Sequence, residues 1–270
     1  MPDPIEIPPL VRPPLEWWMG EVRGCLSDRI HAVLIHGSVA LGDFCPGWSD
    51  VDFCVGVNGS ISESDGEALG EIHDRLEDRY LCRRADGWRS GQILEGCYVP
   101  RELMVEPEAE LPSFTAGGGT RRWVVEQPIA PFDRYVLAHS GLVLAGEPVS
   151  AAPSGRSALA AQTRRELAEV RRHASGSPSS IWLCAIQHWL ARSLVFWRDG
   201  EMLSKSAALR REIERDSPSA EAFRMALVIR DAGSSAAAGH HAELEHHFAE
   251  SGLPCSAEIG DLVETTRGED

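Results

Sequence analysis

Two short apolar segments, each next to polar residues, constrain the fold of the first half of this 270-residue chain more than any other feature. The first segment, Leu34-Ile35-His36-Gly37-Ser38, is followed after eleven residues by a second, Asp50-Val51-Asp52-Phe53-Cys54-Val55. Because successive side chains of a strand point to opposite faces, Asp50 and Asp52 share one face while the residues between and after them point into the protein. Neighbouring carboxylates repel unless something positive lies between them, so the pattern indicates a metal site.

The Gly37-Ser38 pair indicates that a phosphate binds at the same place. Glycine has no side chain, so the backbone can approach a phosphate closely, and nearby N–H groups with the Ser38 hydroxyl can hold its oxygens. A bound triphosphate would bring the magnesium that two aspartates need. The alternative is a strand that carries two solvated aspartates after a turn, because motifs this short also occur by chance.

The two segments together resemble the Gly-Ser to Asp-x-Asp signature of the nucleotidyltransferase superfamily related to DNA polymerase beta. The matching residues are His36-Gly37-Ser38 and Ser49-Asp50-Val51-Asp52-Phe53. Within that superfamily the chain most resembles the aminoglycoside nucleotidyltransferases of the streptomycin and spectinomycin type. The resemblance implies transfer of AMP from ATP to a hydroxyl, with two Mg²⁺ ions on Asp50 and Asp52 and the triphosphate on Gly37 and Ser38.

The rest of the chain predicts an α+β fold in two domains. Strand and helix patterns alternate in residues 1–150, which suits a nucleotidyltransferase domain with a mixed sheet after an extended, proline-rich arm at 1–13. Residues 149–157 are rich in Ser, Ala, Pro and Gly and mark the domain boundary. Strand patterns are absent beyond it, so residues 151–270 are predicted to form an all-α bundle that closes the active-site cleft.

The resemblance assigns two further residues of the first domain. Glu95 lies within an apolar strand pattern, where a carboxylate must reach solvent or face other charges. A glutamate on the corresponding strand of the resembled family is the catalytic base, and the alternative for Glu95 is an exposed glutamate on an edge strand. Residues 100–128 are predicted to be a solvated loop. The family places an acceptor-contacting tryptophan in a loop of this region, which makes Trp123 the candidate.

Lys205 is the sole lysine of the chain, against 25 arginines. It lies in residues 200–208, GEMLSKSAA, which resemble the Gly-x-x-x-x-Lys-Asp-x-Ala element of the aminoglycoside enzymes, whose lysine contacts the triphosphate. A flexible ammonium suits that task as a movable point charge. Ser206 departs from the family, which has an aspartate there to grip the amines of the acceptor. Asp199 could supply a substrate-binding carboxylate, although Leu194 replaces the tryptophan that accompanies it in the family.

The composition fits a soluble globular protein, with 43% hydrophobic and 25% charged residues. No apolar run approaches the roughly 18 residues of a membrane span. The start of the chain lacks the basic segment and apolar core of a signal peptide, so a cytoplasmic location is expected. The seven cysteines are odd in number and show no Cys-x-x-Cys spacing, which argues against a disulfide framework or a zinc site.

The net charge of −15 is concentrated in the first half of the chain. Residues 1–150 hold 24 acidic and 12 basic side chains, whereas residues 151–270 hold 17 and 14. Such a field repels nucleic acid and attracts cations, although many proteins are acidic only for solubility. The expected partners are ATP and a small cationic acceptor such as an aminoglycoside or aminocyclitol, in antibiotic resistance, with no nucleic acid and no membrane. The sequence does not fix the oligomeric state, and a monomer is expected.

Two alternatives for the function stay open. The same fold could transfer a nucleotide to another acceptor, such as a biosynthetic intermediate, a protein or a tRNA end. The acidic first half disfavours tRNA, and Ser206 leaves a different small acceptor open. The chain could also bind nucleotides without catalysis, but the presence of Asp50, Asp52 and Glu95 weighs against that alternative.

Overall fold

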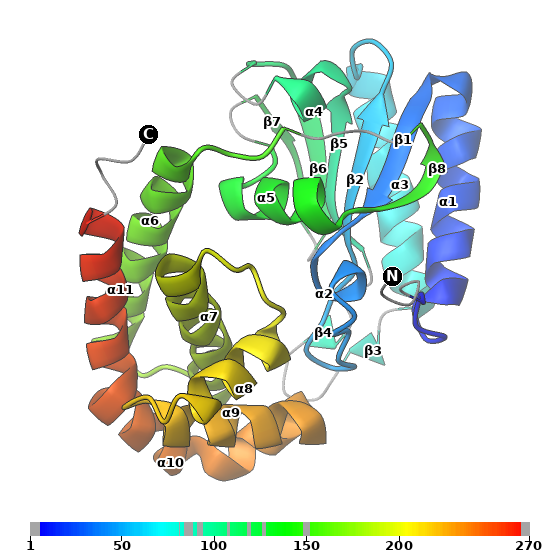
Figure 1. Cartoon of the computed structure of the whole chain (residues 1–270). Coiled ribbons are helices and arrows are strands. Elements are labelled where there is room, and N and C mark those ends of the chain that lie inside the picture. Colours follow the sequence, from blue (N-terminus) through cyan, green and yellow to red (C-terminus); the bar gives the residue numbers. More distant parts are fainter. Residues whose placement is uncertain are drawn as a thin grey trace. The chain divides into compact units, whose positions relative to one another are not determined.

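The structure, a computed structural model, describes residues 6–80, 82–83, 89–90, 94–106, 109–117, 120–125, 128–147 and 152–265. The chain divides into two compact units, Met1–Ser154 and Gly155–Asp270. The first unit combines a sheet with helices, and the second is helical throughout its described residues (Figure 1). The predicted α+β fold class, with a mixed sheet followed by a helical region, is confirmed.

Six strands form the mixed sheet of the first unit, in the order β7-β6-β5-β2-β1-β8. Strands β2 and β5 are parallel, and the other neighbouring pairs are antiparallel. The strands are β1 (Ile30–Ile35), β2 (Asp52–Val57), β5 (Glu95–Pro100), β6 (Ser113–Gly117), β7 (Thr120–Val124) and β8 (Leu142–Gly146). A second, two-stranded sheet pairs β3 (Cys82–Arg83) with β4 (Arg89–Ser90).

Helices cover both faces of the large sheet (Figure 1). On one face α1 (Arg12–Leu26) packs beside α3 (Glu63–Tyr80), and on the other lie α4 (Glu102–Val105) and α5 (Pro131–Ser140). The short helix α2 (Gly37–Ala40) directly follows β1. Each face therefore has its own apolar core, as expected for a sheet buried on both sides.

The alternation of side chains along β2 decides which face holds the polar residues. Phe53, Val55 and Val57 belong to the core under α1 and α3, whereas Cys54 belongs to the core under α4 and α5. Because residues two apart share a face, Asp52 lies on the same face as Cys54. The carboxylates of the Asp-x-Asp motif therefore project on the α5 side of the sheet.

The core under α1 and α3 contains a small buried polar network behind the β2–β5 pair. The indole Nε1 of Trp18 donates to the Tyr98 hydroxyl at 2.9 Å, and that hydroxyl lies 2.8 Å from Nε2 of His73. The three side chains are at most 1% exposed, and the ring of His73 stacks on Phe53. Since each buried polar atom has a partner, the network holds β2 and β5 against the helices without a desolvation penalty.

Local capping explains where the first helices begin. Pro13 and Pro14 occupy the first turn of α1, where no backbone N–H is needed, so the helix starts at Arg12. At the start of α3 the Ser62 hydroxyl accepts from the Asp65 N–H, and the Asp65 carboxylate accepts from the Ser62 N–H. This reciprocal pair is a capping box.

The prediction of a solvated loop over residues 100–128 is wrong. The described part of this region contains α4 and the antiparallel pair β6–β7, in which Phe114 faces Trp123 across the strands. The alternation in β6 is short and β7 carries two arginines, so the region is more polar than a typical strand pattern. Pairing with β5 and packing of Phe114 under α3 supply the stability that the local pattern lacks.

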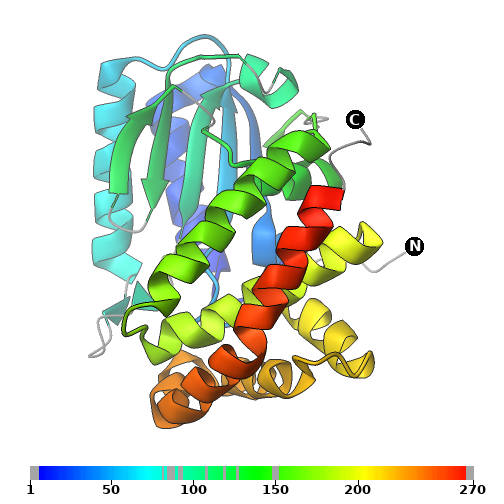
Figure 2. The ribbon, with the colours of Figure 1, turned by 90° about the vertical axis from the view of Figure 1, so that its left-hand side faces the viewer.

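The second unit consists of helices around the largely buried α7. Its helices are α6 (Arg156–Ala174), α7 (Ser180–Asp199), α8 (Lys205–Glu214), α9 (Ala220–Ala232), α10 (His241–His247) and α11 (Leu253–Thr265). Ser179 caps the start of α7, and Gly200 ends it in the left-handed conformation. Helices α6 and α11 lie side by side (Figure 2). No helix in the described residues is long and apolar enough to cross a membrane.

Candidate active site

A pocket of about 430 Å³ lies on the α5 side of the sheet, within the size range of small-molecule sites. Polar and apolar residues from the strands and from α5 line it. The polar ones include His36, Asp50, Asp52, Glu95, Thr115, Arg122 and Asp133. The structure therefore brings together in the first unit the three carboxylates that the sequence singled out.

The Gly-Ser segment lies directly against the Asp-x-Asp motif. A Cβ added at residue 37 would come within 1.7 Å of Oδ2 of Asp52, and Gly37 has a positive φ of 62°. The Ser38 hydroxyl donates to the Asp50 carbonyl oxygen at 3.3 Å, and the His36 N–H donates to the Asp52 carbonyl oxygen at 2.9 Å. Only glycine satisfies both the backbone conformation and the contact with Asp52.

Glu95 is the first residue of β5, a strand held between β2 and β6, so the alternative of an edge-strand glutamate does not hold. It is the registered partner of Asp52 in the parallel pair. Partial burial, the Asp50 and Asp133 carboxylates and a hydrogen bond with Asp50 raise the pKa of Glu95 to about 7, although the residue stays accessible from the pocket. Gly117 crosses Glu95 so closely that a Cβ there would lie 2.7 Å from its side chain.

Asp133 is a site residue that the sequence analysis missed. It lies in the first turn of α5, is exposed toward solvent and lines the pocket together with Asp50, Asp52 and Glu95. An aspartate in the first turn of a helix is common because it complements the helix dipole, so no local pattern distinguishes Asp133 from an ordinary residue of that turn. Packing of α5 on the sheet brings Asp133 to the pocket.

Arg122 is the second missed residue. Its neighbour Arg121 pairs with Asp74 at 3.1 Å and Glu77 at 2.9 Å on the α3 face. Since alternate residues of a strand point to opposite faces, Arg122 points to the other face, where it lines the pocket beside its registered partner Thr115. Once β7 is recognised as a strand, this alternation finds Arg122.

Trp123 is not brought to the pocket. It packs against Phe114 at a ring distance of 5.6 Å and against Gly66 of α3, where a Cβ would come within 2.5 Å of the indole. These contacts lie on the opposite face of the sheet from Asp52 and Glu95. Its neighbour Arg122 lines the pocket instead.

His36 lies between the end of β1 and the start of α2 and is only 5% exposed. Its Nδ1 atom is buried and has no hydrogen-bond partner among the described residues. Burial lowers the pKa of this imidazole, while Asp133, Asp50 and a hydrogen bond to the Phe53 backbone oppose the shift. His36 is therefore neutral near pH 7 and adds no positive charge to the carboxylate pocket.

The carboxylates fit a magnesium ion bound together with phosphates. The described residues contain no group of three or more His, Cys, Asp or Glu side chains arranged as a metal cage. Magnesium keeps most of its waters and takes only one or two protein carboxylates besides substrate phosphates. Asp50 and Asp52, next to Gly37 and Ser38, supply that donor set. Burial and, after it, the charges of Asp50 and Asp133 raise the pKa of Glu95, and a cation would offset those charges.

Lys205 belongs to the second unit, where it is the first residue of α8. Ser204 caps this helix by accepting a hydrogen bond from the Ala207 N–H at 3.3 Å. Burial, Lys205 and Arg230 lower the pKa of His188 to about 3. The Ser206 hydroxyl is buried and accepts from Nε of Arg230 at 2.9 Å. The residue that replaces the acceptor-gripping aspartate of the family therefore faces an arginine inside its own unit.

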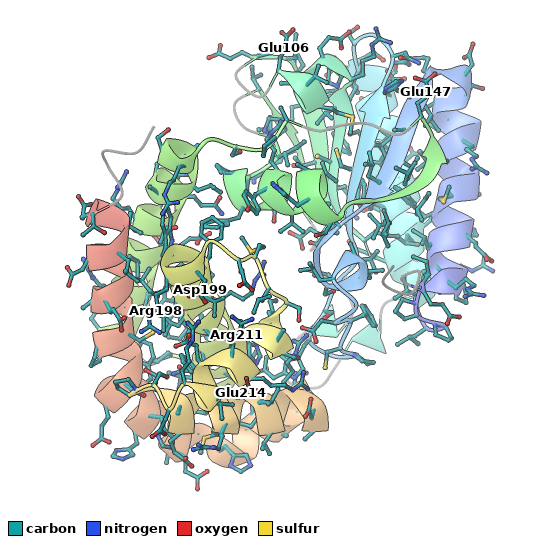
Figure 3. All side chains as sticks on the ribbon, viewed as in Figure 1. Glu106, Glu147, Arg198, Asp199, Arg211 and Glu214 are labelled. Atoms are coloured by element: carbon teal, nitrogen blue, oxygen red, sulfur yellow. The ribbon has the colours of Figure 1, made fainter. Side chains whose placement is uncertain are left out.

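Asp199 also lies in the second unit, at the end of α7 (Figure 3). Its Oδ2 accepts from Arg215 at 2.7 Å and lies 3.7 Å from Arg211. Leu194, five residues earlier, is 1% exposed and part of the helical core. Any role of Asp199 toward an amine would compete with these two ion pairs.

Comparison with known proteins supports the fold. Protein-family models match no part of the sequence, and no curated protein sequence matches it. Among solved structures, the chain is similar to spectinomycin adenyltransferase AAD(9) from Enterococcus faecialis, determined with ATP and spectinomycin, with a TM-score of 0.66 and 13% identity. The similarity covers 93% of this chain and 98% of that chain. The chain therefore has a nucleotidyltransferase fold.

Proposed function

We propose that the protein transfers AMP from ATP to a hydroxyl of a small aminated acceptor, such as an aminoglycoside or aminocyclitol. The observation that supports this most is the meeting of Asp50, Asp52 and Glu95 in one pocket beside Gly37 and Ser38. The similar solved structure is an adenyltransferase that holds ATP and spectinomycin. A cytoplasmic enzyme of this kind would act in antibiotic resistance.

Asp50 and Asp52 are the residues proposed to hold two magnesium ions. When bound, these ions neutralise phosphate charge and favour in-line displacement at the α-phosphorus. Gly37 and Ser38 would bind the triphosphate through backbone N–H groups and the hydroxyl. Lys205 would add a cation from the helical unit, which in this proposal closes over the nucleotide.

Glu95 is proposed as the general base. Its carboxyl group lies beside Asp50 in the pocket, so an acceptor hydroxyl placed there can reach it. A pKa of about 7 suits proton transfer at neutral pH, since the group can both accept and release the proton. Asp199 is proposed to meet an acceptor amine in place of one of its arginines, whereas Trp123, packed on α3, is left out.

The test is mass spectrometry of a panel of aminoglycosides and aminocyclitols incubated with ATP, magnesium and protein. The expected result is an AMP adduct on one or more acceptors, with release of pyrophosphate. Glu95→Gln should stop transfer while ATP still binds in a calorimetric titration. Turnover at the wild-type rate in Glu95→Gln would remove the proposed base, and loss of ATP binding would instead make Glu95 a metal ligand.

One observation favours a second candidate function, nucleotide transfer to a different kind of acceptor. Ser206 is buried against Arg230, so the element that supplies an amine-binding aspartate in the resembled family presents no carboxylate here. If no member of the aminated panel gains AMP although ATP binds, this second candidate takes precedence.

A further inference from the structure

The two ends of the pocket differ in charge. At one end lie the carboxylates of Asp50, Asp52, Glu95 and Asp133, and at the other lies Arg122. Arg122 is exposed and makes no ion pair within the described ranges, whereas its neighbour Arg121 is neutralised by Asp74 and Glu77. An arginine that lines a pocket without such a carboxylate partner is available to a ligand.

The order of the strands shows on which side of the reacting groups Arg122 lies. Gly37-Ser38, the pair proposed to bind the triphosphate, follows β1. Asp52 begins β2, Glu95 begins β5, Thr115 lies on β6 and Arg122 lies on β7. These strands are successive neighbours in the sheet. Gly37-Ser38 and Arg122 therefore lie on opposite sides of Glu95. Two strand spacings, roughly 10 Å, separate β5 from β7.

In this strand order, Arg122 lies where the acceptor, and not the nucleotide, would bind. A nucleotide held at Gly37-Ser38 places its phosphates on the β1 side of Glu95, and the attacking hydroxyl must lie at Glu95 itself. The part of the acceptor beyond the hydroxyl then lies over β6 and β7. There the Thr115 hydroxyl donates to the Arg122 carbonyl oxygen at 3.4 Å, and the exposed guanidinium of Arg122 lines the pocket. A guanidinium recognises carboxylates and phosphates through two parallel hydrogen bonds.

We infer that Arg122 binds an oxyanion of the acceptor, a carboxylate or a phosphate, on the side away from the hydroxyl that is modified. The inference rests on the proposed nucleotide transfer and narrows its acceptor. Amines fit the acidic end of the pocket and an oxyanion fits the β7 end, so a molecule that carries both is a better acceptor than a polycation.

Three related probes test this inference: D-glucosamine, D-glucosamine 6-phosphate and D-glucosaminate, each incubated with ATP and magnesium. Mass spectrometry then measures the rate at which each gains AMP. We expect at least one oxyanion-bearing probe to be modified about tenfold faster than glucosamine, which corresponds to one charge-assisted hydrogen-bonded pair. The phosphate and carboxylate arms show which oxyanion is preferred.

Variants at residue 122 connect that preference to the arginine. Arg122→Ala should lose the preference for the oxyanion-bearing probe and leave the Kd for ATP unchanged, and Arg122→Lys should keep part of it. The matched control is Arg23→Ala, which removes another exposed arginine from α1 and should keep the full preference. An increase in the Kd for ATP in Arg122→Ala would place the arginine on the nucleotide and overturn the inference.

The outcomes separate this inference from the proposed function. If wild-type protein does not bind ATP, the proposed function fails. If ATP binds but neither oxyanion-bearing probe is modified, or if all three probes are modified equally, only the oxyanion inference fails. A preference that survives Arg122→Ala also overturns it.

Discussion

The carboxylates that line the pocket of the first unit and the ion-paired carboxylates of the second unit have opposite surroundings. In the first unit Glu95 lies against Asp50 and Asp133, and these like charges help to raise its pKa. In the second unit Glu212 is fully buried between Arg198 and Arg215, and Asp199 lies between Arg215 and Arg211. Arg198 also pairs with Glu258 of α11. The ion pairs of the second unit stabilise its fold, whereas the neighbouring carboxylates in the pocket of the first unit repel one another.

Repulsion between neighbouring like charges is typical of a binding or catalytic site. Structural ion pairs hold charges next to opposite charges, and functional sites shift pKa values by placing like charges together until a ligand arrives. Removing one of these carboxylates should therefore have opposite consequences at the two places. In the pocket of the first unit it should remove activity without loss of stability, and among the ion pairs of the second unit it should remove stability.

The largest expected effect is that of Asp52→Asn on transfer. Loss of a magnesium ligand should lower kcat by about three orders of magnitude, or roughly 4 kcal/mol of transition-state stabilisation. The free energy of unfolding should stay constant or rise, because one repelling charge is gone. Pyrophosphate release and urea denaturation measure the two quantities, with Asp28→Asn as the exposed control. Unchanged turnover would remove Asp52 from the metal site.

The complementary change in the second unit is Glu212→Gln. Because Arg198 and Arg215 would lose their shared carboxylate, the free energy of unfolding should fall by about 2 kcal/mol. Urea denaturation measures this fall, and Glu214→Gln, on the exposed side of α8, serves as the control. If Glu212→Gln and Glu214→Gln had equal free energies of unfolding, the ion pairs of Glu212 would not stabilise the second unit, and the contrast with the pocket carboxylates would be wrong.

Both units should lose stability in acid through a deeply buried histidine, His73 in the first unit and His188 in the second. Burial lowers the pKa of His73 and of His188 to about 3, from 6.5. Below pH 6.5 the unfolded chain binds a proton that the folded chain does not, so the free energy of unfolding falls by about 1.4 kcal/mol per pH unit for each histidine, down to about pH 3. His73→Gln and His188→Gln should each flatten the slope of stability against pH by that amount. An unchanged slope would show that the histidine is protonated in the folded protein.

The smallest expected effect concerns Lys205, which tests whether the second unit contributes to nucleotide binding. Lys205→Ala should raise the KM for ATP about tenfold and change kcat little, since one charge-assisted hydrogen bond to a phosphate is lost. Arg210→Ala, an exposed cation of the same helix, is the control. An unaltered KM in Lys205→Ala would leave ATP binding to the first unit alone.

Most of the fold could be predicted from local patterns. Gly37-Ser38 and the Asp-x-Asp motif predicted a strand, a turn and a second strand, and the helical periods predicted the second unit. The hairpin β6–β7 could not be predicted, because its polar residues match a loop until β5 and α3 provide partners. Arg122 and Asp133 could not be assigned for the same reason, since their side chains reach the pocket only through that hairpin and the packing of α5.

The sequence alone determined that the Gly-Ser and Asp-x-Asp segments supply polar groups to one site, because a glycine without a side chain and two carboxylates one residue apart act through local geometry. Tertiary structure decided the rest of the pocket. Parallel pairing of β2 with β5 placed Glu95 opposite Asp52, α5 added Asp133, and β7 added Arg122 while it turned Trp123 away. These residues are distant in sequence, and only long-range pairing and packing define their common neighbourhood.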